Sequence, residues 1–168
     1  VPQHDLDGNL LSGATGPAAG QTFEWDARSR LVAVKDAAGT ELVRYAYDHL
    51  GRKIKRTAAG ATTLFVHRGW HCIAEYTVTG ASVALSKSYT WGLDASGGAF
   101  GAGGAGGLLA QTVSGTSSYP LYDGSGNVTE YLDATGTVVA HLEYDAFGKV
   151  ISSTGSLAAF RYQYSTKP

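Results

Sequence analysis

An Asp-x-x-Gly motif recurs along this chain at fixed intervals, and the intervals limit the folds that the chain can adopt. From Asp123 the next two copies begin ten and then twelve residues later, at Asp133 and Asp145. The first half of the chain repeats these intervals, so the chain contains an internal repeat of 22 residues with two turns. The copies are Asp5–Gly8, the degenerate Asp26–Ser29, Asp36–Gly39, Asp48–Gly51, Asp94–Gly97, Asp123–Gly126, Asp133–Gly136 and Asp145–Gly148.

The two fixed residues of the motif suit a tight turn. The Asp carboxylate can accept a hydrogen bond from the backbone two residues on, and Gly in fourth place tolerates the positive φ of a type I turn with a bulge. Turns every ten to twelve residues leave strands of about five to seven residues, which is typical of consecutive β-hairpins. We therefore assign a structural role in the turns to Asp36, Gly39, Tyr47, Asp48, Gly51, Tyr122, Asp123, Gly126, Asp133, Gly136, Tyr144, Asp145 and Gly148.

The segments between the turns alternate as half-buried strands do. In 138–144, Val138, Ala140, Leu142 and Tyr144 share an apolar face, and we expect Tyr144 to be buried. No segment keeps a helical period, so the predicted fold is all-β, with antiparallel hairpins forming a curved or spiralling sheet.

The chain is interpreted as one β region, residues 1–168. Residues 1–60 hold the first repeats, 61–96 less regular strands, 97–107 a Gly-rich and flexible loop, and 108–168 the second repeats. The aromatic alternation of 160–164 predicts a last strand.

Composition excludes several classes. The net charge is -1 with 16% charged residues, so the basic surface that nucleic-acid binding needs is missing. No apolar run approaches the length of a membrane span. The single Cys72 can form no internal disulfide. Met is absent and the chain starts inside a repeat, so we expect a fragment of a larger protein.

Three turn segments carry a resemblance to a known family. Tyr47–Arg52, Tyr122–Val128 and Tyr144–Val150 resemble the Y-D-x-x-G-R/N-L/V repeat of the Rhs family, which is related to toxin-complex proteins and teneurins. Ser88–Asp94 is similar to the segment that precedes the Rhs-associated core, and Phe160–Lys167 to the start of that core. Two departures are His4 in the Tyr position and the missing Gly after Asp26.

The resemblance implies a non-enzymatic segment of a hollow β-shell, secreted or at a bacterial surface. Its partners would be the rest of its own shell and an enclosed C-terminal toxin or effector polypeptide. Family cores often cleave themselves with aspartates, but the resemblance places that region after this chain, so no catalytic residue is assigned. Unpaired edge strands could also pair with a second copy.

Each of the other candidate sites also has a structural explanation. His67, His71 and Cys72 are metal-ligand types, yet packing beside Trp70 explains them as well, and we assign no metal and no cofactor. The Gly101–Gly106 segment matches G-x-G-x-x-G but precedes a predicted strand, against a dinucleotide site. Calcium would need denser acidic spacing than the turns offer, and no G-x-S-x-G elbow occurs.

The aromatic residues leave one alternative function open. Trp25, Trp70, Trp91 and the ten tyrosines could stack on sugar rings, as in an adhesion or carbohydrate-binding module. They could equally be cross-strand packing residues. The sequon Asn127–Thr129 lies in a turn, and we expect no glycan on it.

Overall fold

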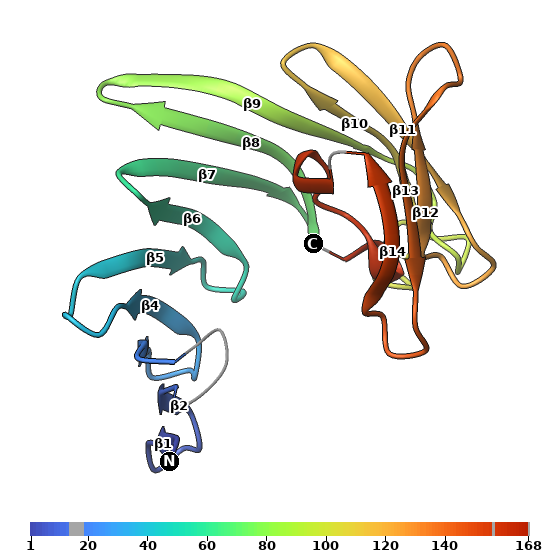
Figure 1. Cartoon of the computed structure of the whole chain (residues 1–168). Coiled ribbons are helices and arrows are strands. Elements are labelled where there is room, and N and C mark those ends of the chain that lie inside the picture. The colour runs from blue at the N-terminus through green and yellow to red at the C-terminus, as the bar shows by residue number, and fades with distance from the viewer. Residues whose placement is uncertain (14–18, 156, 168) are drawn as a thin grey trace. The chain divides into compact units, whose positions relative to one another are not determined.

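The computed structural model describes residues 1–13, 19–155 and 157–167, and the regular secondary structure of these residues is almost entirely β-strand (Figure 1). The turn motif sets the strand lengths, because each turn ends one strand shortly before the next begins. The strands are β1 (Gln3–His4), β2 (Leu10–Ser12), β3 (Thr22–Trp25), β4 (Leu31–Lys35), β5 (Glu41–Tyr47), β6 (Lys53–Ala58), β7 (Ala61–Arg68), β8 (His71–Thr79), β9 (Ser82–Trp91), β10 (Leu108–Val113), β11 (Thr116–Tyr122), β12 (Val128–Leu132), β13 (Val138–Tyr144) and β14 (Val150–Gly155), followed by the 3-10 turns η2 (Leu157–Ala159) and η3 (Tyr164–Thr166).

Fourteen strands form one open sheet in which strands adjacent in sequence are adjacent in the sheet. Their pairing is antiparallel, as between β13 and β14, where His141 lies opposite Thr154. The register shifts by one residue beside many Asp turns, for example between Glu143 and Tyr144, as a bulge requires. The predicted all-β fold of consecutive hairpins is confirmed, and the predicted curvature of the sheet stays a prediction.

Two compact units divide the chain. Unit 1 comprises Val1–Phe65 and Tyr76–Ala84, and unit 2 comprises Val66–Glu75 and Leu85–Pro168. Neither 3-10 turn of the described residues is long enough to cross a bilayer.

Unit 1 buries few side chains. Of its described apolar residues, those classed as buried are Ala33 and Val34 on β4 and Phe65 on β7. Its stability therefore depends strongly on turn and strand hydrogen bonds as well as on apolar burial.

Unit 2 has a denser interior. Val128 and Tyr131 on β12 pack with Ala140 on β13 and with Phe160 from the C-terminal segment. Tyr131 is completely buried, whereas Tyr144 is only half-buried, so the expectation that Tyr144 is a buried core residue is wrong. The reason is the C-terminal segment, which covers Tyr131: the Phe160 ring stacks on the Tyr131 ring with centroids 4.0 Å apart.

The strand predicted for 160–164 is also wrong. These residues form no ladder with the sheet, and Tyr164 begins η3. Their alternate side chains contact unit 2, which produces the same period of two as a strand in a sheet.

The Gly-rich segment is folded rather than a free flexible loop. The carboxylate of Asp94, only 5% exposed, accepts hydrogen bonds from the amides of Ala102 and Gly104. Gly104 has φ +87, and a Cβ there would lie 2.7 Å from Nε2 of His71. Glycine at this position thus serves close packing against the imidazole.

Candidate functional site

Eight Asp-led turns share one main-chain geometry. The amide in fourth place donates to the Asp carbonyl, as Gly51 does to Asp48 at 3.0 Å. In the reverse direction the Asp amide donates to the carbonyl in fifth place, as Asp48 does to Arg52 at 3.0 Å. The degenerate copy keeps the geometry, because Ser29 adopts the positive φ, 53°, that Gly adopts elsewhere.

One carboxylate oxygen of each turn binds the turn's own backbone. In Asp145, Oδ1 accepts from the amides of Phe147 and Lys149, both at 2.9 Å. The bond from the residue two places on is present at all eight turns. The donor residues are Asp7, Arg28, Ala38, Leu50, Ser96, Ser125, Thr135 and Phe147.

In four turns, those of Asp5, Asp26, Asp48 and Asp123, the second carboxylate oxygen binds the side chain in fifth place. Arg30 Nε donates to Oδ2 of Asp26, and Arg52 Nε donates to Oδ2 of Asp48, both at 2.7 Å. Asn127 makes the same bond to Asp123 at 2.7 Å. Sequence reasoning gave no role to this position, although the recurrence of Arg or Asn after the Gly was the available signal.

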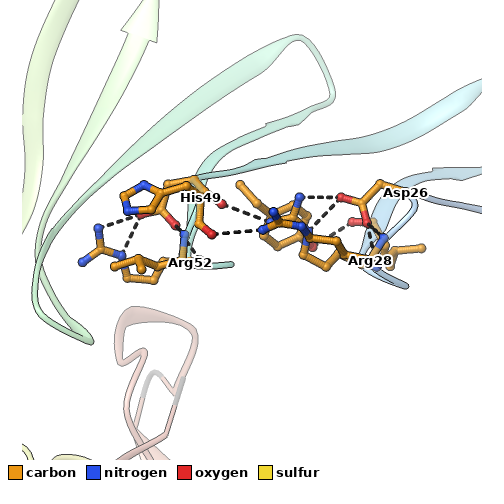
Figure 2. A network of polar contacts seen from close by, with 9 residues as sticks. Asp26, Arg28, His49 and Arg52 are labelled. Atoms are coloured by element: carbon orange, nitrogen blue, oxygen red, sulfur yellow. Dashed lines mark hydrogen bonds and ion pairs between the residues drawn. The ribbon is translucent and has the colours of Figure 1, made fainter.

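The fifth-place arginine also reaches the following repeat. Figure 2 shows the network around Asp26, Arg28, His49 and Arg52. Arg30 Nη1 donates to the carbonyl of Asp48 at 3.1 Å, and Arg28 Nη1 donates to the carbonyl of His49 at 3.0 Å. Neighbouring repeats of unit 1 are thereby joined turn to turn.

The aromatic residue before the Asp joins repeats in the opposite direction. Tyr47 Oη donates to the carbonyl of Leu31 at 2.7 Å, and Tyr144 Oη donates to that of Val128 at 2.7 Å. Trp25 replaces Tyr and donates from Nε1 to Leu10 at 2.7 Å. Each of these acceptors lies directly after the fifth-place residue of the first turn in the preceding repeat.

Electrostatics follow from these bonds. The side-chain hydrogen bond from Arg30 lowers the pKa of Asp26 to about 2, and the bond from Ser96 lowers the pKa of Asp94 to about 2. Burial raises the pKa of Tyr144 to about 12. These carboxylates are therefore ionised at neutral pH and the phenol is neutral.

The second turn of each repeat lacks the tyrosine and the Arg or Asn. Asp36 is followed by Thr40 in fifth place, and Asp133 by Thr137. Both Asp side chains bind only amides and nearby hydroxyls, as when Thr135 Oγ1 donates to Asp133 at 2.7 Å. The two turns of a repeat are therefore chemically different.

The C-terminal segment Leu157–Lys167, here termed the strap, binds unit 2. Phe160 stacks on Tyr131 with ring centroids 4.0 Å apart, and Tyr162 meets Trp91 edge-on at 5.1 Å. Tyr131 Oη donates to the carbonyl of Tyr162 at 2.7 Å. The strap therefore helps to cover the interior of unit 2.

A buried polar cluster joins Arg161 of the strap to Glu75 and Tyr89. Arg161 Nη1 forms an ion pair with Oε1 of Glu75 at 2.7 Å, and the hydroxyl of Tyr89 donates to the same oxygen at 2.6 Å. Burial, followed by that bond, raises the pKa of Tyr89 far above its ordinary range. The cluster fixes the charged Arg161 side chain next to Glu75. The Tyr89 phenol keeps its proton near neutral pH.

The His67, His71 and Cys72 cluster does not assemble as a metal site. Within the described residues no group of three His, Cys, Asp or Glu side chains could hold a metal ion. His71 instead stacks on Trp91 with centroids 4.1 Å apart, and burial raises the pKa of the Cys72 thiol. The three residues line a cavity of about 370 Å³ that Arg161 also lines.

The aromatic residues proposed for sugar stacking are partly committed to the fold. Trp91 Nε1 donates to the carbonyl of Cys72 at 2.8 Å, and Trp25 is bound as described above. Trp70 is 63% exposed and remains accessible. The sequon residue Asn127 uses its side chain for Asp123 and for the amide of Ser165, 2.8 Å away.

Comparison with known proteins gives matches at three levels. The RHS Repeat family model matches residues 25–63 and 122–159, which are the two segments that carry the ten- and twelve-residue turn spacing. A tRNA3(Ser)-specific nuclease, WapA of Bacillus spizizenii, is 30% identical over 86% of this chain and 6% of its own length. Double-stranded DNA deaminase toxin A of Burkholderia cenocepacia is 32% identical over 55% of this chain and 7% of its own.

Solved structures match the fold. The Photorhabdus luminescens Tc holotoxin pore aligns with a TM-score of 0.65 and 16% identity, covering 97% of this chain and 8% of that one. TcdB2–TccC3–Cdc42 aligns with a TM-score of 0.63 over the same shares. This chain therefore spans less than a tenth of the relatives that it resembles.

Proposed function

Because this chain belongs to the Rhs (YD-repeat) family, we propose that it is a non-enzymatic wall segment of a β-shell that encloses or displays a toxin or effector polypeptide. Its partners are then the rest of its own shell and the enclosed polypeptide. The shell would act outside the cytoplasm, secreted or at a bacterial surface. The nuclease and deaminase activities that the relatives are named for would lie outside the segment matched here.

The observation that carries this proposal is the joint between successive YD turns. Arg30 binds its own turn at Asp26 and the first turn of the following repeat at Asp48, and Tyr47 binds back to Leu31. The tyrosine part of this joint recurs where Tyr144 binds back to Val128, so the joint can be repeated from one repeat to the next. A wall built from similar repeats requires this property, whereas a single catalytic site does not.

The chemistry of the aspartates supports a non-enzymatic role. Both carboxylate oxygens of Asp26 and of Asp48 are bound within the turn network. A general acid needs a pKa near the working pH, and the pKa of Asp26 is held near 2. The repeated carboxylates are thus suited to fixing backbone.

Protease protection tests the proposal in the longer polypeptide that contains this segment. A shell should shield the enclosed polypeptide from a nonspecific protease under native conditions. Replacing Arg30 by Met and Tyr131 by Ala together should open the wall and expose it, while Arg56→Met, an exposed position, should leave protection intact. Equal digestion of the enclosed part in the native and doubly substituted proteins would overturn the enclosing role. Hydrolytic activity or self-cleavage of the 168-residue chain by itself would overturn the non-enzymatic role.

A further inference from the structure

The strap is held the way a receptor holds a peptide. Several of its backbone bonds go to side chains of the sheet: Gln111 Nε2 donates to the carbonyl of Ala159 at 2.7 Å, and Gln111 Oε1 accepts from the amide of Arg161 at 3.3 Å. One bond joins main chains, from the amide of Val128 to the carbonyl of Gln163 at 3.1 Å. Lys87 Nζ also donates to Ala159, at 3.3 Å. A β-strand would instead exchange amide and carbonyl bonds with a neighbouring strand.

The side chains of the strap alternate between apolar and ionic contacts. Phe160 and Tyr162 are 8% and 4% exposed, and their rings contact the aromatic interior of unit 2. Arg161 between them pairs with Glu75, whose side chain is 11% exposed. A buried carboxylate needs a charged partner, so this pair favours a positively charged side chain at that place in the strap.

The far end of the strap is fixed to two glycine-containing turns. Thr166 Oγ1 donates to the carbonyl of Gly126 and accepts from the amide of Gly106, both at 2.8 Å. Thr166 adopts φ 50°, which is rare for a β-branched residue. Backbone strain of this kind persists only where surrounding contacts determine it.

From these contacts we propose that unit 2 is a peptide-binding site for an extended aromatic–arginine–aromatic segment, and that the strap is its resident ligand, bound independently of the chain connection. Arg161 is the residue that determines specificity, through Glu75. This inference goes beyond the wall role and does not depend on it. It implies that the strap remains bound after the chain before it is cut.

A cleavable full chain tests this directly. A specific protease site is inserted between Gly155 and Leu157, the protein is folded, and the site is cut. In gel filtration the released strap should co-elute with the remainder of the chain. With Arg161→Met it should dissociate at least about tenfold faster, and Arg161→Lys should recover part of the retention, since lysine keeps the charge but not the planar group.

Two further variants keep the test decisive. Arg44→Met removes an exposed arginine that pairs with Glu41 in unit 1, and it should leave retention of the strap unchanged. If Arg161→Met fails to fold, Tyr131→Phe replaces it, because it removes one bond to the strap and keeps the ring that stacks on Phe160. Immediate loss of the strap from the cut parent chain would overturn the proposal. So would equal retention in the parent chain and in the strap-binding variants.

Discussion

Arg30 connects two turns with one side chain: its Nε donates to Asp26 at 2.7 Å and its Nη1 donates to the carbonyl of Asp48 at 3.1 Å. The guanidinium also lies 4.8 Å from the centre of the Tyr47 ring. This relationship explains three positions of the Y-D-x-x-G-R/N pattern at once. The aspartate fixes its own turn, the arginine reaches the first turn of the next repeat, and the tyrosine of that repeat packs on the arginine.

Removing the arginine should weaken unit 1. Arg30→Met should lower the melting temperature by about 2–4 °C, because each net hydrogen bond contributes on the order of 1 kcal/mol. Differential scanning calorimetry measures the shift. Arg56→Met, at an exposed position of β6, is the matched control, and an equal shift in both variants would contradict the linking role.

The contribution of a tyrosine to the free energy of unfolding depends on how deeply its side chain is buried. Tyr131→Ala should reduce the free energy of unfolding by about 3–5 kcal/mol, as expected for a large aromatic side chain lost from a core. Tyr144→Ala should cost roughly half as much, since Tyr144 is only half-buried. Urea titration followed by tryptophan fluorescence compares the two. A larger loss of stability for Tyr144→Ala would contradict the assignment of Tyr131 to the core of unit 2.

Glycines of the motif differ in their surroundings. Gly136 has φ +83, and no atom of the described residues, its two chain neighbours aside, lies within 4 Å of the place that a Cβ would occupy. Gly136→Ala should therefore cost about 1 kcal/mol of backbone strain. Gly148 has φ +84, and a Cβ there would lie 2.6 Å from the ring of Tyr164. Gly148→Ala should cost about 1 kcal/mol more, because the Tyr164 ring must move. Equal unfolding free energies of the two variants would show that the contact with the Tyr164 ring does not affect stability.

Acid should destabilise the turns in a defined range. The ordinary pKa of an Asp side chain is 3.8, and the pKa of Asp26 in the folded protein is about 2. Ionised Asp26 therefore stabilises the fold above about pH 4, and this contribution is lost as the pH falls from about 4 to 2. Melting temperatures of the parent chain and of Asp26→Asn across pH 5 to 2 should converge at the acid end. A constant difference between the two would contradict the assignment.

Much of this architecture is local, which is why the sequence could predict it. Asp133 and Gly136 specify a turn with bonds that span only a few residues, and the strand 138–144 begins and ends where the alternation predicts. The role of Arg30 was missed because its second partner, the Asp48 carbonyl, is a main-chain group with no sequence signature. The sequence does distinguish the two turns of the repeat, since only the first has the Tyr and the Arg or Asn, but it does not show what these side chains contact.

Long-range contacts account for the remaining differences. The alternation of 160–164 is genuine, yet its partners are Tyr131 and Trp91 rather than a neighbouring strand. The Gly-rich segment has few side chains to indicate structure, and its organising group is the carboxylate of Asp94, eight residues before Ala102. Periodicity indicates which side chains point the same way, but it does not identify what they contact.

A double-mutant cycle between Arg30 and Tyr47 tests most directly whether YD turns are joints between repeats. The cycle compares unfolding free energies of the parent chain, Arg30→Met, Tyr47→Leu and the double variant, with the Lys53 and Tyr45 pair, whose ammonium lies 4.7 Å from the ring centre, as a reference within one hairpin. We expect a coupling energy of about 0.5–2 kcal/mol between Arg30 and Tyr47. Additive effects, with a coupling below about 0.3 kcal/mol, would contradict the account.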